Sequence, residues 1–309
     1  MPRFDVTIAG ELNMDLILYG LPDELPPERE LLADRMTFTL GGSSSIAAHN
    51  LAALGSRVGF ISCIGRDSLG DMALARLAEG GVDVEKVRRS GDGTGTGITV
   101  ILQREKWRNM LTYSGTIATL RFEDLDFSYL CDSRHFHFCS YYLQLGLLPR
   151  AAELLQRIKS AGLTISMDTN DDPDNQWGHG LMHALEYVDV FLPNASEAQR
   201  ITGTSDVETA LSKLAERIPV VAIKLGAKGA IAQRGKERVH APGLKVDFVD
   251  AVGAGDTFDA GFLHQFVRGS DLMTCLKSGN AAGAFSTTRA GGTEAFRDPE
   301  WRQKFFGNL

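Results

Sequence analysis

Short apolar stretches rich in β-branched residues alternate with helical segments along most of the chain, and this alternation constrains the fold most strongly. Buried strands are predicted at residues 4–10, 57–64, 135–139, 163–168, 188–192 and 220–224. Helices are predicted at residues 44–54, 67–80, 149–161, 195–201, 207–217, 254–267 and 271–288. Near-continuous apolar strands separated by helices are typical of a parallel sheet covered on both faces. We therefore predict an α/β fold, Rossmann-like, with a mostly parallel sheet and helices on both faces.

Two segments interrupt this rhythm. Residues 16–40 contain Pro22, Pro26 and Pro27 and show no helical period, and residues 93–118 alternate like exposed antiparallel strands around a polar turn. We interpret both as a small β-stranded lid. A length of 309 residues allows about two domains or one large one, and the chain shows no repeat or Gly/Ser linker. The prediction is a single domain over residues 1–309 with this lid attached.

The charge and cysteine content narrow the class of partner. The chain has 32 Lys and Arg against 39 Asp and Glu, a net charge of −7, which argues against an electrostatic nucleic-acid binder. No apolar stretch approaches the roughly 18 residues of a membrane span, and the N-terminus has no signal-like region. None of the four cysteines forms a C-x-x-C motif. We expect a cytoplasmic protein that acts on a small molecule.

The sequence FVDAVGAGDTFDAGFL, residues 248–263, carries the strongest chemical signal. Gly253, Ala254 and Gly255 have little or no side chain and precede a helical pattern, so their N–H groups can bind an anion at a helix N-terminus. Asp256 then falls in the first helical turn. Its carboxylate either accepts a proton from an attacking hydroxyl or only complements the helix dipole, and spacing alone leaves both interpretations open.

Three further motifs each have a structural and a functional interpretation. Asn194 and Glu197 form a capping-box pattern that could also contact the hydration shell of a metal. Gly226 and Gly229 join two strands, as a tight turn or as a close approach to a nucleotide. Asn13 and Asp15 follow the first strand, where they form a turn or hold sugar hydroxyls.

Several familiar motifs are excluded. The chain has no Walker A string, and the first strand leads into AGELNMD rather than a G-x-G-x-x-G loop. DTNDDPDN, residues 168–175, resembles a calcium loop, but Pro173 and His179 occupy the positions that need glycine and glutamate. His135 and His137 share a strand face, but two histidines do not make a zinc site.

Taken in order, these strings resemble the ribokinase family, also called phosphofructokinase-B type carbohydrate kinases. LGGSSSIAAHNLAALG (residues 40–55) resembles the glycine-rich N-terminal signature of the family, and DAVGAGDTFDAGF (residues 250–262) closely resembles its C-terminal signature. NASE and KLGAKGA fit its N-x-x-E motif and its nucleotide turn. The resemblance implies a Rossmann-like fold with a β lid. It also implies an ATP- and Mg²⁺-dependent kinase that transfers the γ-phosphoryl group to a hydroxyl of a sugar or sugar derivative.

The resemblance further implies roles for single residues. Asp256 is implied as the general base, and the amides of Gly253, Ala254 and Gly255 as the anion hole for the transferred phosphoryl group. The residues implied at the nucleotide, the phosphates and Mg²⁺ are Asn194, Glu197 (Mg²⁺ through water), Lys224, Gly226, Gly229 and Asn280. Those implied at the sugar are Asn13, Asp15, Gly41 and Gly42. Asp250 is implied near a monovalent cation, K⁺.

Departures from the family pattern bear on the acceptor. True ribokinases usually carry Lys and Asn where this chain has Ser43 and Ile46, and a glutamate where it has Ser140, Tyr141 and Tyr142. We therefore expect an acceptor other than ribose. One alternative is a nucleoside kinase of the same family, with base stacking on Trp107, Tyr113 or Tyr141, and another is a non-catalytic sugar- or nucleotide-binding protein. The apolar lid residues Ile98, Val100 and Leu102 allow a homodimer formed through the lid.

Overall fold

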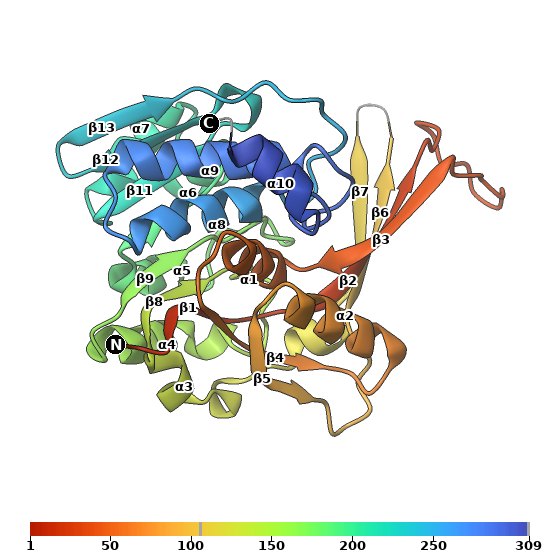
Figure 1. Cartoon of the computed structure of the whole chain (residues 1–309), viewed down its shortest axis with the longest axis horizontal. Coiled ribbons are helices and arrows are strands. Elements are labelled where there is room, and N and C mark those ends of the chain that lie inside the picture. The colour runs from red at the N-terminus through yellow and green to blue at the C-terminus, as the bar shows by residue number, and fades with distance from the viewer. Residues whose placement is uncertain (105–106, 308–309) are drawn as a thin grey trace.

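A nine-stranded sheet forms the centre of the molecule in the computed structural model, which describes residues 1–104 and 107–307 (Figure 1). In spatial order its strands are β13 (Glu237–Ala241), β12 (Ala230–Arg234), β11 (Val220–Lys224), β10 (Val190–Phe191), β9 (Thr164–Met167), β8 (Ser133–Phe138), β1 (Phe4–Ala9), β4 (Val58–Ile64) and β5 (Asp83–Arg89). All neighbours from β11 to β5 pair in parallel, whereas β12 and β13 are antiparallel. The predicted mostly parallel sheet is confirmed.

The direction in which the chain adds strands reverses between β1 and β8. From β1 the sheet grows through β4 and β5 on one side, and from β8 it grows through β9, β10 and β11 on the other. In open α/β sheets, ligands bind beyond the carboxyl ends of the strands at such a reversal. The residues that follow β1 and β8 are therefore candidates for ligand binding.

Helices cover both faces of this sheet, as predicted. One face carries α3 (Phe127–Cys131), α4 (Ala151–Ser160), α5 (Leu181–Ala184), α6 (Ala195–Thr202) and α7 (Val207–Ala215). The other carries α1 (Ser43–Ala53), α2 (Ser68–Glu79), α8 (Ala254–Phe266) and α9 (Leu272–Ser286), and α10 (Pro299–Phe306) packs on the end of α9. Short 3₁₀ turns lie at Gly115–Ala118, Phe122–Asp124, Leu148–Arg150, Leu185–Tyr187 and Gly226–Lys228.

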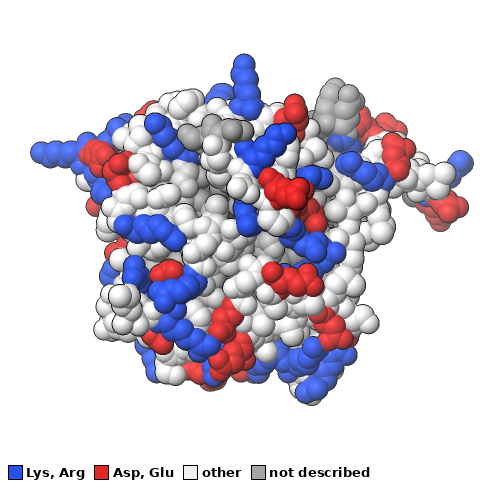
Figure 2. Space-filling model, viewed as in Figure 1, with Lys and Arg blue, Asp and Glu red and all other residues white. Residues whose placement is uncertain are grey.

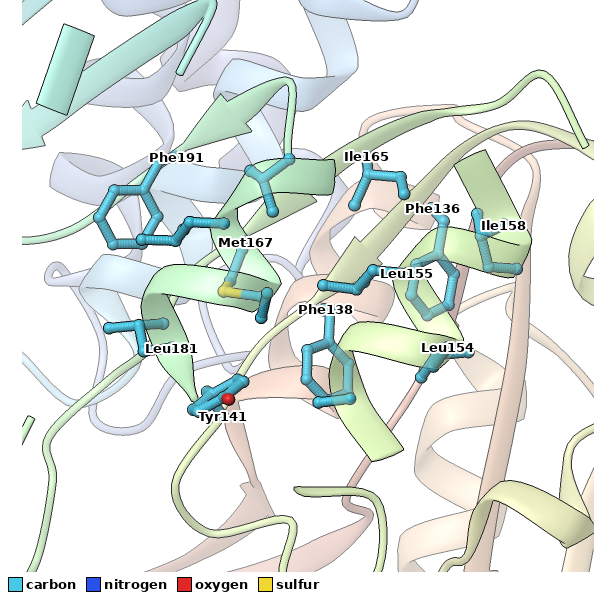
Figure 3. Packing of buried hydrophobic residues seen from close by; sticks show 14 of the residues in the cluster. Phe136, Phe138, Tyr141, Leu154, Leu155, Ile158, Ile165, Met167, Leu181 and Phe191 are labelled. Carbon is cyan, nitrogen blue, oxygen red and sulfur yellow. The ribbon is translucent and has the colours of Figure 1, made fainter. Parts of the chain in front are cut away.

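Alternation along the strands divides the core between the two faces. On β8, Phe136 and Phe138 pack toward α4 and α5, where Figure 3 shows them among Leu154, Leu155 and Ile158. His135 and His137 lie on the opposite face, where the ring of His135 packs near Phe266 of α8. The two-residue repeat of a strand thus places apolar side chains in one core and imidazoles in the other.

The two histidines belong to a buried hydrogen-bonded row. His135 lies 2.7 Å from both Thr164 and Ser166, and His137 lies 2.7 Å from the same Ser166 hydroxyl. Burial lowers the pKa of His135 to about 3 and that of His137 to about 4, so both are neutral at physiological pH. In the part of the chain that the structure describes, no group of three or more His, Cys, Asp or Glu residues is arranged to hold a metal.

A separate four-stranded sheet stands beside the main one (Figure 1). Its spatial order is β3 (Arg35–Gly41), β2 (Asn13–Tyr19), β6 (Ile98–Gln103) and β7 (Arg108–Tyr113). Cross-strand partners share a face, so Asp15 lies with Thr39, Thr99 and Thr112 on a polar face. The opposite face carries the apolar rows Leu40–Met14–Ile98–Tyr113 and Phe38–Leu16–Val100–Leu111.

This sheet corresponds to the predicted lid, although its first strand begins earlier, at Asn13. The antiparallel hairpin expected within residues 93–118 is present as β6 and β7. Residues 105–106 of that segment, and residues 308–309 of the predicted domain, lie outside the described residues. The division into one domain with a lid at residues 16–40 and 93–118 stays a prediction.

The distribution of surface charge and the lengths of the helices are relevant to the predictions about nucleic-acid binding and cellular location. On the face drawn in Figure 2, Lys and Arg are interspersed with Asp and Glu. Among the described residues, every helix is too short or too polar to traverse a bilayer. The cytoplasmic location and the lack of a nucleic-acid partner stay predictions.

The turn between β11 and β12 contains two glycines with different environments. Gly226 has φ of +60°, and an added Cβ would meet no atom within 4 Å. Gly229 has φ of +95°, and an added Cβ would lie 2.1 Å from the carbonyl oxygen of Ala241 and 2.5 Å from the amide nitrogen of Gly243. Within the folded chain, Gly226 is therefore required for its backbone conformation, whereas Gly229 is also required for close backbone packing. The approach of Gly226 to a nucleotide stays a prediction.

We predict that Gly229→Ala destabilises the protein by about 3 kcal/mol or more, because a strained backbone and an overpacked contact add together. The matched variant Gly226→Ala should reduce the free energy of unfolding by only about 1–2 kcal/mol, the penalty of a left-handed residue. Urea unfolding of both variants measures the difference. Equal losses in the two variants would show that the contact with residues 241–243 is unimportant.

Candidate active site

The N-terminus of α8 forms a bend without bulky side chains above the carboxyl edge of the main sheet. Gly253 precedes the helix with φ of +70°, and an added Cβ would lie 2.6 Å from Cα of Gly292. No side chain caps this helix. The amide of Ala254 donates a long hydrogen bond, 3.3 Å, to the carbonyl of Ala251. Since the first amides of a helix have no intrahelical acceptor, the N–H group of Gly255 suits an anion, and that of Ala254 does so once this long bond is given up.

Asp256 occupies the first turn of α8, as the sequence predicted, and is partly exposed. Desolvation and the negative charge of Asp168 raise the pKa of its carboxyl group to about 6, against the opposing effects of the Lys224 charge and the Ser43 hydroxyl. A carboxylate with this pKa is largely ionised at neutral pH, yet it is a stronger base than an ordinary aspartate.

Lys224, at the end of β11, lies beneath this helix terminus. Its Nζ atom is 2.6 Å from Asp168, which follows β9, and 3.2 Å from Asp259 of α8. An added Cβ at Gly255 would lie 3.5 Å from the same Nζ atom. The two carboxylates raise the pKa of Lys224, so the ammonium stays charged directly behind the proposed anion hole.

Asn194 and Glu197 form the capping box that their spacing predicted. The Asn194 side chain accepts from the amide of Glu197 at 3.0 Å, and the Asn194 amide donates to Glu197 at 2.8 Å. The Asn194 side-chain amide donates to the other oxygen of Glu197. Burial, followed by the charge of Asp168, raises the pKa of Glu197 to about 8. A nearby divalent cation would favour its ionised form, so the residue fits an indirect Mg²⁺ role, which stays a prediction.

Asn194 is also tied to Lys224 through the backbone. The two residues form an isolated parallel bridge, and the Lys224 amide donates to the carbonyl of Pro193 at 3.0 Å. The capping box therefore lies next to Lys224 and its two carboxylate partners, at the same edge of the sheet.

Asn280 and Gly229 meet at residues 241–243. The Asn280 side chain donates to the carbonyls of Ala241 at 2.9 Å and Pro242 at 3.1 Å. The same segment packs against Gly229. The structure therefore gathers these two residues at one corner, where each has a structural partner, and their contact with a nucleotide stays a prediction.

The four residues predicted at the sugar lie together. Asn13 and Gly41 are partners in the β2–β3 ladder, and the side-chain amide of Asn13 donates to Asp15 at 3.3 Å. An added Cβ at Gly41 would lie 2.0 Å from Oδ1 of Asp15, and one at Gly42 would lie 2.4 Å from Oδ1 of Asn13. The absence of side chains on the two glycines makes the space that these polar groups occupy.

The charge of Asp256 affects the ionisation of Asp15. Burial raises the pKa of Asp15 to about 7, and the charge of Asp256 is the next largest cause. The Tyr19 hydroxyl of β2 donates to Asp250, shortly before α8. The strand that carries Asn13 and Asp15 is thus tied to the segment that leads into the helix of Asp256.

The contacts of Asp250 indicate a structural role that links separate segments of the chain. Its carboxylate accepts hydrogen bonds from the Tyr19 hydroxyl, from the amide of Val252 at 2.8 Å and from the amide of Gly291 at 3.1 Å. The side chain thus ties β2 to the loop before α8. These donors already engage both oxygens, so the described contacts of this side chain give no support to K⁺ binding, which stays a prediction.

The aromatic residues considered for stacking on a nucleoside base do not gather here. Tyr141 is only 1% exposed, lies in the core among Phe138 and Leu181 (Figure 3), and donates its hydroxyl to the carbonyl of His179. The expectation that Tyr141 stacks on a ligand is wrong, because no face of the ring is free. Tyr113 lies on the apolar face of the small sheet, opposite Asp15, and Trp107 is exposed beside the β6–β7 turn.

Sequence reasoning missed several polar residues of this edge. The most important are Glu11, Asp168, Asn170 and Asp259, all of which contact predicted site residues or their neighbours. Glu11 and Asp168 each follow a buried strand, the same signal that pointed to Asn13 and Asp15. Asp259 is three residues after Asp256 on α8, a spacing that places both on one helix face.

Comparisons with known proteins agree with this geometry. The model of the pfkB family carbohydrate kinases matches residues 3–299. The chain is 31% identical to a 2-dehydro-3-deoxygluconokinase of Bacillus subtilis, over 82% of each chain, and 28% identical to a ribokinase of Haemophilus influenzae, over 94% of each. The structure of a putative ribokinase II from E. coli in complex with ATP and Mg²⁺ superposes with a TM-score of 0.84 at 25% identity, covering 99% of this chain and 100% of that one. The chain belongs to the pfkB family of carbohydrate kinases.

Proposed function

We propose that this ATP-dependent sugar kinase transfers the γ-phosphoryl group of ATP to a hydroxyl that Asp256 deprotonates. The observation that carries the proposal is the position of Asp256, with a raised pKa, in the first turn of an uncapped helix N-terminus. The amides of Gly253, Ala254 and Gly255 would donate hydrogen bonds to the negatively charged oxygens of the transferred group. Asp256 would take the proton of the attacking hydroxyl as the oxygen–phosphorus bond forms.

Phosphoryl transfer needs positioning and charge stabilisation more than covalent chemistry from the protein. The Lys224 ammonium behind the helix terminus would reinforce the helix dipole. Asn13, Asp15, Gly41 and Gly42 would orient the acceptor from the side of the small sheet, and closure of that sheet would exclude water. ATP supplies the phosphoryl group, and Mg²⁺ would neutralise its phosphate charge with Glu197 contacting the ion through water.

Relatives of this chain differ in the acceptor for which they are named. The two curated relatives are named for different acceptors, as a ribokinase and as a 2-dehydro-3-deoxygluconokinase. A non-catalytic binding protein would have no need of a base beside an anion site, so the position of Asp256 favours the enzyme.

We predict that Asp256→Asn lowers kcat by roughly 10²- to 10⁴-fold, the usual contribution of a general base, while ATP affinity changes little. An ADP-release assay and calorimetric titration with ATP measure the two quantities. The matched control is Asp271→Asn, at the N-terminal cap of the next helix, α9. The Asp271 side chain accepts from the amide of Thr274 and not from a residue of the site, so this variant should leave kcat unchanged. Near-normal turnover of Asp256→Asn would remove it as the base.

The pH dependence should report the same group. Only the ionised carboxylate accepts a proton, so kcat/KM should fall as the pH drops through about 6, the pKa of Asp256. A profile of kcat/KM between pH 5 and 9 measures this limb. Activity that stays constant down to pH 5 would contradict the assignment.

We further propose that two copies of the chain associate through the apolar face of the small sheet. Leu111 and Tyr113 are 58% and 57% exposed there, and Ile98, Val100 and Leu102 are only half-buried in the single chain. An isologous contact would cover this face in both copies with the same residues.

Leu111→Lys should convert a dimer into a monomer, because it places a charge on the shared apolar face. Light scattering coupled to size-exclusion chromatography distinguishes the two masses. Met182→Lys, at an exposed position on α5, is the matched control and should leave the mass unchanged. A wild-type protein that is monomeric at micromolar concentration would refute the interface.

A further inference from the structure

Two buried polar residues of α1, His49 and Asn50, lie against the N-terminus of α8 and are not used by the proposed mechanism. Their exposed fractions are 2% and 0%, and α1 packs beside α8 (Figure 1). The side-chain amide of Asn50 lies 2.8 Å from the hydroxyl of Thr257, in the first turn of α8, and 3.0 Å from the carbonyl oxygen of Gly292. Nδ1 of His49 lies 2.8 Å from Oδ1 of Asn50. A chain of polar side chains therefore runs from α1 to the start of α8.

The partners fix the direction of each hydrogen bond in this chain. A backbone carbonyl can only accept, so the part of the Asn50 amide that faces Gly292 is its NH₂ group. The other amide atom is then the oxygen, and His49 must donate to it from a protonated Nδ1. The NH₂ group donates its second hydrogen to Thr257, whose hydroxyl in turn donates to the carbonyl of Gly253 at 2.7 Å. The chain of donors thus ends on the residue that precedes α8.

Asn50 also decides which carbonyl receives the hydrogen of Thr257. That hydroxyl has one hydrogen and two carbonyl oxygens in reach, Gly253 at 2.7 Å and Gly292 at 3.5 Å. Since the Gly292 oxygen already accepts from Asn50, the hydroxyl keeps its hydrogen on Gly253. The Gly253 carbonyl also accepts from the amide of Thr257 at 2.9 Å. No side chain caps α8, so these two bonds are what fixes its first turn to Gly253.

Apolar packing from the same face of α1 supports the bend. Ile46 lies one turn before Asn50, so both side chains lie on one face of the helix. An added Cβ at Gly253 would lie 3.1 Å from Cδ1 of Ile46, and one at Gly292 would lie 2.7 Å from the same atom. The two residues of α1 therefore hold Gly253, which has φ of +70°, against Gly292.

We propose that His49 and Asn50 are positioning residues, which hold the amides of the proposed anion hole in the geometry that the transferred phosphoryl group needs. The proposal rests on the proposed function, because it concerns the same site. Donors that are already in place cost no reorganisation when charge develops on the phosphoryl oxygens. A displacement of about 1 Å, caused by a substitution away from the chemistry, can lower the rate by about 10²-fold.

The first test replaces the Asn50 amide with an apolar group of similar size. Asn50→Leu removes both donors, so the Gly292 oxygen loses its partner and the hydrogen of Thr257 can turn toward it. We expect kcat to fall by roughly 10- to 100-fold, while the KM for ATP changes by less than about threefold, because the loss arises only as charge develops in the transition state. ADP release is measured with whichever of ribose, fructose, gluconate and inosine gives the fastest turnover.

A binding measurement separates positioning from a general loss of structure. Aluminium fluoride bound with ADP and Mg²⁺ is an anion that mimics the transferring phosphoryl group, and mimics of a transition state bind more tightly than ground-state ligands. We expect aluminium fluoride to tighten ADP binding by the wild-type protein in calorimetric titrations. Asn50→Leu should reduce this gain by about tenfold and leave the affinity for ADP alone within about threefold. A residue with only a structural role would change both affinities together.

His49 provides a second test that leaves the donors of Asn50 in place. His49→Leu removes the group that orients the Asn50 amide, and should lower kcat by about tenfold. His49→Asn places an amide nitrogen close to the position of Nδ1, so it should recover most of that loss. The matched control is Leu211→Ala, in the core on the other face of the main sheet. Its cavity lowers the Tm, but kcat and the gain from aluminium fluoride should stay unchanged.

The outcomes that contradict the inference differ from the one that contradicts the proposed function. If Asn50→Leu folds, as judged by thermal unfolding, and keeps both the wild-type kcat and the gain from aluminium fluoride, the positioning role is overturned and the kinase function stands. If Asn50→Leu does not fold, the His49 variants decide, and equal losses in His49→Asn and His49→Leu overturn the role. A wild-type protein that neither consumes ATP with these acceptors nor binds ADP more tightly with aluminium fluoride would overturn the proposed function, and the inference with it.

Discussion

The buried ammonium of Lys224 is the interaction on which the arrangement of the site depends. It lies between Asp168 and Asp259, and so links the ends of β11 and β9 to the first turns of α8. Removing one partner from a buried ion group leaves an uncompensated charge, which is strongly destabilising. The cluster therefore keeps the helix terminus above the carboxyl edge of the sheet, and it does so with a cation close to where a phosphate would bind.

Local patterns along the chain predicted most of the fold because strand and helix periods are local properties. The parallel strands from β1 to β11 were foreseen from apolar runs, but β5 was not, since Asp83–Arg89 reads as a polar segment. That strand lies at the edge of the sheet, where charged side chains are expected and no second core face has to be filled. The parallel pairing of β2 with β6 was not foreseen either, because it joins segments about 80 residues apart.

The site was predictable to the extent that its residues lie in contiguous motifs. Asp256 and the three small residues before it form one string, and their geometry follows from a helix starting there. Asp259 lies in the same string, but its partner Lys224 comes from another element, as do Ser140 and Ser43, the partners of Glu11 and Asn170. The reversal of strand order between β1 and β8 brings Glu11 and Ser140 together, and that reversal is a property of the whole sheet. Tyr141 shows the converse error, since an aromatic residue near a strand end was filling the core.

Negative charge is compensated near the N-terminus of α8 but much less so near Asp15. At the proposed nucleotide side, the helix terminus and the Lys224 ammonium would offset the repulsion between the phosphates and the Asp256 carboxylate. At the acceptor side no such compensation acts on Asp15: apart from burial, the charges that shift its pKa most are those of Asp256, Glu11 and Asp250, and all three raise it. A base that must abstract a proton benefits from this imbalance, because neighbouring carboxylates raise its basicity.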